Sequence, residues 1–147
     1  MRNILSVFLF LWMPYFNPKP TEKTKQGVCG TVLLKQGNQM PAPGRKLSPG
    51  QPVIREIAVY QLTNLSDVKN TDGIFSAIKT ALVAKTRSNA KGYFELTLPI
   101  GKYSVFVVEK EGLYANYFNG KGSINPVEVL KDSLVNKDIY ISNKAVF

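Results

Sequence analysis

The side chains best suited to hold a ligand lie in residues 114–120, which read YANYFNG. Flat aromatic rings stack on sugar rings, and an asparagine amide both donates hydrogen bonds to hydroxyl groups and accepts them. The candidate ligand or partner surface therefore consists of Tyr114, Asn116, Tyr117, Phe118 and Asn119. The same rings would also cap a hydrophobic core, which is the more common role of aromatic residues, so both interpretations stand.

Catalytic groups are scarce, because the 147 residues include no histidine and a single cysteine, Cys29. The lack of histidine removes histidine general bases, Ser–His and Cys–His nucleophile pairs and imidazole metal ligands. We interpret Cys29 as a small packing residue, since no local cluster of cations would lower the pKa of its thiol. Two carboxylate pairs, Asp67 with Asp72 and Glu109 with Glu111, are read as solvated loop charges. We predict no catalytic residue, no cofactor, no metal and no enzymatic activity.

The net charge of +9 is spread along the chain, and no run of five basic residues occurs. Nucleic-acid binding requires basic residues that cluster on one face or stripe, so a scattered charge argues against it. Weak attraction to anionic polymers or membrane surfaces stays open.

Residues 4–13 (ILSVFLFLWM) form an unbroken apolar run that follows Arg2 and ends before Pro14. A helix of this length, rising about 1.5 Å per residue, spans roughly half of the hydrocarbon core of a bilayer. The run is thus too short for an ordinary transmembrane helix and suits a signal peptide. Because residues 14–17 lack the small residues of a good cleavage site, a retained anchor and a buried N-terminal helix are the alternatives.

We therefore divide the chain into three parts. Residues 1–16 are a signal peptide or N-terminal hydrophobic segment, residues 17–26 are a flexible, proline-containing lead-in, and residues 27–147 form one domain. An exported protein is expected, periplasmic, outer-membrane-associated or secreted. It has no stable transmembrane span if the N-terminal segment is cleaved.

The clearest structural signal lies in residues 86–108 (TRSNAKGYFELTLPIGKYSVFVV). Apolar and polar side chains alternate strictly over residues 93–98, which is the period of a half-buried strand. Residues 98–101 form a turn with Pro99 in its second position, and a second strand follows over residues 102–109. Since the turn is short, we expect these two strands to pair antiparallel.

Further strands are predicted over residues 27–35, 53–63, 81–87, 124–130 and 134–142. Pro126 places its strand at a sheet edge. The proline- and glycine-rich residues 40–52 predict a long exposed loop, and apolar residues at helical spacing within 64–80 predict a loop with one short helical turn. Seven or eight short strands with almost no helix indicate an all-β fold, a two-sheet antiparallel β-sandwich.

Four segments, read in order, resemble the carboxypeptidase regulatory-like domain, a transthyretin-like (prealbumin-type) Greek-key β-sandwich. They are residues 27–32 (GVCGTV), 37–41 (GNQMP), 59–60 (VY) and 86–105 (TRSNAKGYFELTLPIGKYSV). The last follows the family run T-D-x-x-G-x-F-x-L-x-L-P-x-G-x-Y-x-V, and the resemblance extends over residues 27–142. The longer loop at 40–52 and the insertion at 64–80 depart from the pattern. Because the matching positions are turn and core residues, the resemblance implies a fold and little about activity.

Two enzyme groups use similar sandwiches, the hydroxyisourate hydrolases and the intradiol dioxygenases. Both depend on histidine, and this chain has none and ends in NKAVF where the former carry Tyr-Arg-Gly-Ser. Together with the composition, the resemblance predicts a non-catalytic exported module that mediates protein interaction or has an accessory role at the cell envelope. The alternative is a carbohydrate-binding module that uses residues 114–118. The expected partner is a protein or a glycan at the cell envelope, and not nucleic acid.

Overall fold

The computed structural model describes residues 25–142 and 145–146. Within this part the chain is built from strands, joined by loops and by one three-residue 3-10 turn, η1 (Leu65–Asp67). No helix in the described part is long and apolar enough to cross a membrane. The predicted N-terminal hydrophobic segment, and all but the last two residues of the lead-in, lie outside the described residues.

One sheet is organised around its central strand, β1 (Gly27–Leu34). Its antiparallel partners are β8 (Tyr93–Thr97) and β3 (Gln51–Pro52), and its parallel partners are β12 (Leu134–Asn136) and β13 (Ile139–Ile141). Val28, Gly30 and Val32 point to the buried side of β1, as the period-2 pattern predicts. Cys29 lies on the other face, partly buried and as a free thiol.

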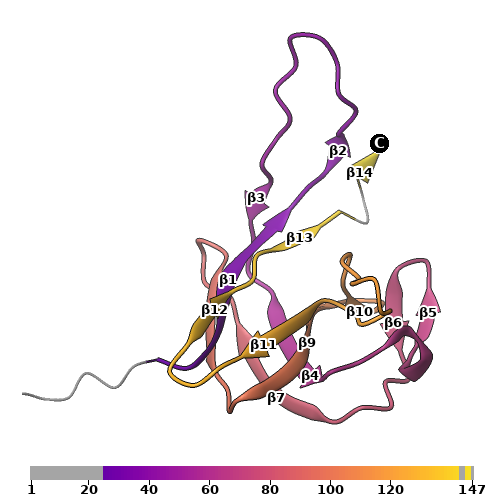
Figure 1. Cartoon of the computed structure of the whole chain (residues 1–147). Coiled ribbons are helices and arrows are strands. Elements are labelled where there is room, and N and C mark those ends of the chain that lie inside the picture. The colour runs from indigo at the N-terminus through magenta and orange to yellow at the C-terminus, as the bar shows by residue number, and fades with distance from the viewer. Residues whose placement is uncertain (1–24, 143–144, 147) are drawn as a thin grey trace, which may run out of the picture.

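The second sheet runs in the order β5-β6-β10-β9-β4-β7, with β11 also paired to β9 (Figure 1). Its strands are β4 (Glu56–Gln61), β5 (Lys69–Thr71), β6 (Ile74–Ser76), β7 (Leu82–Arg87), β9 (Gly101–Glu109), β10 (Gly112–Tyr114) and β11 (Pro126–Val129). All pairings in this sheet are antiparallel. Among the described strands β11 pairs with β9 alone, which confirms the edge position predicted from Pro126.

The two sheets face each other across one hydrophobic cluster. From the first sheet it takes side chains such as Val28, Val32 and Phe94, and from the second Ile57 and Val105, all at most 1% exposed. Burying each such side chain contributes about 1.5–3 kcal/mol relative to leaving it in water. The predicted all-β sandwich is therefore confirmed, with the added feature that β1 pairs in parallel with β12 and β13.

The predicted hairpin between residues 93–97 and 102–109 is wrong, because β8 and β9 belong to different sheets. The 98–101 turn carries the chain from one sheet to the other, so that Leu98 and Tyr103 enter the same core from opposite sides. The Tyr103 hydroxyl donates a hydrogen bond to the carbonyl oxygen of Pro99 at 2.8 Å and braces this crossing.

The helical turn expected from apolar spacing within residues 64–80 is also misplaced. Residues 74–76 form β6, which pairs with β5 and β10, and the helical turn is η1, nine residues earlier. Phe75 explains the difference, because it is fully buried against Phe106 in a second core cluster and needs an extended chain to reach it. So few apolar residues do not decide between a strand and a helical turn by periodicity alone.

Residues 36–52 leave the first sheet as a long projecting segment, here called the arm (Figure 1). Short strands mark its base: β3 returns to β1, and β2 (Gly37–Asn38) pairs in parallel with β14 (Ala145–Val146). Between them residues 40–49 contain no strand and are exposed, as the proline and glycine content predicts.

Candidate functional site

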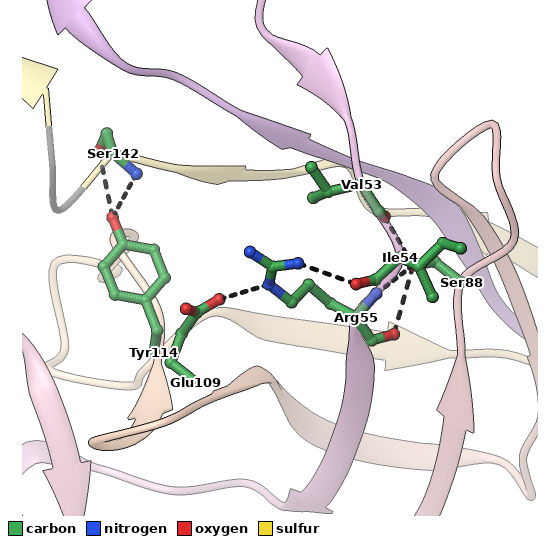
Figure 2. Close-up of polar contacts among 7 residues, drawn as sticks. All are labelled: Val53, Ile54, Arg55, Ser88, Glu109, Tyr114 and Ser142. Atoms are coloured by element: carbon green, nitrogen blue, oxygen red, sulfur yellow. Dashed lines mark hydrogen bonds and ion pairs between the residues drawn. The ribbon is translucent and has the colours of Figure 1, made fainter.

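The structure separates the five predicted surface residues into two groups. Tyr114, at the end of β10, is 4% exposed and belongs to the main core. Its hydroxyl oxygen lies 3.1 Å from the Ser142 hydroxyl and accepts a hydrogen bond from the Ser142 backbone N–H at 3.1 Å (Figure 2). Tyr114 thus ties the second sheet to the end of β13 and presents no surface to a ligand.

Phe118 and Asn119 shape the loop that carries them. The Phe118 ring packs edge-on against Phe75, with 6.1 Å between centroids, although 40% of its surface remains exposed. The Asn119 side-chain oxygen accepts hydrogen bonds from the backbone N–H groups of Lys121 at 3.0 Å and Ser123 at 2.8 Å. Its acceptor capacity is therefore used within the loop, as is common for asparagine in turns.

Asn116 and Tyr117 are exposed and open onto a shared groove of about 300 Å³, here called the Tyr117 groove. The polar and aromatic side chains that line it are Asn116, Tyr117, Asn125, Lys137, Asp138 and Tyr140. It lies where the 115–125 loop meets β13 and the break between β12 and β13. Two of the five predicted residues are thus brought together, and they are joined by four others.

Lys137 occupies the break between β12 and β13 because β1 holds it there. Its backbone N–H donates to the Cys29 carbonyl at 2.7 Å, and its own carbonyl oxygen lies so close to Gly30 that any Cβ there would overlap it. The ammonium group consequently stands 4.4 Å from the centroid of the Tyr117 ring, within the range of a cation–π contact. Partial burial lowers the pKa of Lys137, because removal from water disfavours the charged form.

Tyr140, which also lines the groove, has a similar cationic neighbour. The Lys35 ammonium lies 4.7 Å from the centroid of the Tyr140 ring, which is 38% exposed. Asp138 supplies a negative charge, but its Oδ1 accepts the backbone N–H of Thr31 at 2.8 Å. Asn125 forms part of the floor, with its amide donating to the buried Val105 carbonyl at 2.8 Å.

Glu109 is not the solvated charge that the sequence suggests. Its side chain is 12% exposed and forms an ion pair with Arg55, with 3.0 Å between Nε and Oε1 (Figure 2). The same guanidinium donates to the Ile54 carbonyl at 2.9 Å, and the Arg55 backbone N–H donates to Ser88 Oγ at 2.7 Å. Ser88 Oγ in turn donates to Val53 O at 2.8 Å, so this network fixes the chain where it leaves the arm and enters β4.

A second polar cluster lies on the outer face of β8. The Tyr93 hydroxyl donates to Glu95 at 2.8 Å, and Lys25 lies 2.9 Å from the other carboxylate oxygen. The hydrogen bond to Glu95 raises the pKa of Tyr93 to about 12, and the Lys25 contact, followed by that of Tyr93, lowers the pKa of Glu95. All three side chains are accessible to solvent, so this cluster lies on the outer surface of the sheet.

The sequence alone predicts part of the Tyr117 groove. Apolar Ile139 and Ile141 alternate with Tyr140 in the strand predicted over 134–142, which places Tyr140 on the outer face, whereas nothing local reveals where Lys137 and Asn125 lie. The groove offers ring faces, amides and an ammonium group, which suit binding. In the described part of the chain no three His, Cys, Asp or Glu residues are placed to hold a metal ion. Comparisons of the chain with models of known protein families, with curated proteins and with solved structures found no match.

Proposed function

We propose that this protein is a non-catalytic, exported β-sandwich module of the carboxypeptidase regulatory-like type, and that it works by binding another protein at the cell envelope. The observation that carries the proposal is the arm. It projects from a well-packed sandwich, and loops that protrude from a rigid scaffold commonly serve recognition.

The arm exposes apolar surface far from the core. Met40 and Leu47 are each 49% exposed, so a partner bound to the arm would remove apolar surface from water. Hydrogen bonds within the arm maintain its shape, including Met40 N–H to Asn38 Oδ1 at 2.8 Å and an Arg45 guanidinium to Asn38 O at 2.9 Å. Such pre-organisation reduces the entropy lost on binding.

The charge of the arm indicates what kind of partner it fits. Residues 36–52 include Arg45 and Lys46 and no aspartate or glutamate. Both basic residues are exposed and directly precede Leu47, so a partner with an apolar pocket and acidic residues beside it is complementary to the arm.

The test is capture from envelope extract by the immobilised full chain under mild crosslinking. A double variant, Met40→Ser with Leu47→Ser, is compared with Ile100→Ser with Leu130→Ser, which removes two other apolar side chains exposed by 59% and 57%. We expect the wild type and the Ile100/Leu130 variant to retain one specific protein and the arm variant to lose it. Equal capture by all three proteins, or no captured protein, would refute the role of the arm.

A second candidate function, glycan binding, is favoured by one specific observation. Asn116 and Tyr117, from the loop predicted to contact sugars, are exposed and line a groove with a second tyrosine, Tyr140. On a glycan array, Tyr117→Ala is expected to lose binding without loss of stability, whereas Tyr114→Ala is expected to destabilise the fold because Tyr114 is buried. An array with no bound glycan would dismiss this candidate.

A further inference from the structure

We propose that the Tyr117 groove binds a saccharide that carries a carboxylate, such as a uronic acid, with Lys137 as its ionic contact. This inference rests on the second candidate function above and specifies its ligand class. It is independent of the arm, because no residue of the arm lines the groove.

The first argument is the state of the Lys137 ammonium. It is partly buried, and within the described residues no carboxylate lies close enough to form an ion pair with it. Its contact with the Tyr117 ring compensates the lost hydration only in part. Burial accordingly lowers the pKa of this group. A ligand carboxylate would restore a full counter-charge and accept charge-assisted hydrogen bonds from the ammonium.

The second argument is the arrangement of rings and amides around that ammonium. Tyr117 is 51% exposed and Tyr140 38% exposed, so both retain ring surface that a pyranose could cover. The exposed Asn116 amide can donate to and accept from ring hydroxyls. A volume of about 300 Å³ lies at the small end of the range for ligand pockets and suits the end of a short saccharide.

The third argument is the balance of charge along the groove. Asp138 opposes an anionic ligand, but the Thr31 backbone N–H already occupies one of its carboxylate oxygens. Lys35, whose ammonium lies over the Tyr140 ring, adds a positive charge beside the groove without lining it. The lining therefore holds one ammonium group and one hydrogen-bonded carboxylate, and the neighbouring Lys35 makes the local charge positive, which favours a ligand with negative charge.

The experiment is calorimetric titration of the full chain with trigalacturonate and, in parallel, with its methyl ester, at low salt. The ester keeps the same rings and chain length and removes the charge. We expect the acid to bind at least about tenfold more tightly than the ester, as is typical for a charge-assisted hydrogen bond. Raising the salt concentration should weaken binding of the acid and leave the ester unchanged.

Four variants locate the contact. Lys137→Gln should reduce affinity for the acid by about tenfold, and Lys137→Arg, which keeps the charge, should retain most of it. Lys131→Gln removes a charge from the exposed turn before β12 and should have no effect. Asp138→Asn keeps an acceptor for Thr31 and should strengthen binding of the acid.

The outcomes separate this inference from the function on which it rests. If ester and acid bind equally, the groove is a glycan site without charge selection, and the inference is refuted while glycan binding stands. If neither binds and no glycan on the array binds, both are refuted. If oligoglutamate binds as tightly as trigalacturonate and with the same dependence on Lys137, the groove recognises acidic peptides, and the saccharide assignment is wrong.

Discussion

The hydroxyl of Tyr103 reaches back across a turn to the carbonyl oxygen of Pro99, with 2.8 Å between the two oxygens. This bond spans the point where the chain passes from β8 in one sheet to β9 in the other. Tyr103 is 6% exposed and packs in the main core, so it joins the turn to the core as well. The sequence pattern that resembles a hairpin is therefore a connection between the two layers of the sandwich.

Replacing Tyr103 with phenylalanine is expected to lower the free energy of unfolding by about 1 kcal/mol, since it removes one hydrogen bond and leaves the Pro99 carbonyl without it. Urea denaturation followed by circular dichroism measures the change. Tyr140→Phe is the matched control, because Tyr140 is exposed and its change should stay within about 0.5 kcal/mol. A neutral Tyr103→Phe would show that the turn holds its shape without this bond.

Gly30→Ala should be among the most destabilising single substitutions in β1. The added methyl group would overlap the Lys137 carbonyl, so the loss is expected near the upper end of overpacking costs, about 3 kcal/mol. Gly120→Ala provides the comparison, because a Cβ at that position meets nothing within 4 Å. If Gly30→Ala unfolds at the same urea concentration as Gly120→Ala, then β1 and the 137–138 break are further apart than described here.

The two ion pairs of the second sheet should differ in strength. Arg55→Met leaves the Glu109 carboxylate, which is 12% exposed, without its partner and should cost about 2 kcal/mol. Lys85→Met breaks the pair between Lys85 and Glu56, whose side chains are 50% and 43% exposed, and should cost clearly less than Arg55→Met, because solvent screens this pair. Both costs come from urea denaturation at neutral pH. Equal costs would mean that burial does not distinguish the pairs.

An alkaline titration should find Tyr93 ionising with a pKa of about 12, because its proton is held in the hydrogen bond to Glu95. Glu95→Gln should return the pKa towards the ordinary value of 10.0. The folded state keeps this proton to a higher pH than the unfolded state, so the contribution of Tyr93 to stability falls as the pH rises from 10.0 to about 12. NMR chemical shifts of the Tyr93 ring follow the titration. An ordinary pKa in the wild type would contradict the hydrogen bond.

Local patterns in the sequence predicted most of the strands and little of their pairing. Phe94 and Leu98 alternate with polar neighbours, and this period is enough to identify β8 and its buried face. The turn that follows has the same residues whether it closes a hairpin or crosses between sheets. Which of the two the turn does depends on strands that are distant in sequence, because β1 pairs with β8 and β4 pairs with β9.

For the candidate site, too, the sequence predicts local features but not how distant residues are brought together. Tyr114 and Tyr117 are three residues apart and chemically identical, yet one is 4% and the other 51% exposed. Tyr114 continues strand β10 towards Ser142, whereas Tyr117 lies on the outer loop. Lys137 reaches Tyr117 because Gly30, more than a hundred residues earlier, admits the chain so closely. Contacts between residues so far apart in the chain cannot be predicted from the spacing of neighbouring residues.

The arm is the part of the molecule on which the proposed function depends. The most direct comparison uses the full chain in its native cells. One photo-crosslinking amino acid replaces Leu47, which is exposed on the arm, and in a second protein it replaces Leu130, which is exposed on the sandwich itself. We predict one specific crosslinked protein from position 47, reduced by Arg45→Gln with Lys46→Gln, and none from position 130. The same crosslinked proteins from both positions, or none from position 47, would contradict the proposal that the arm binds a partner.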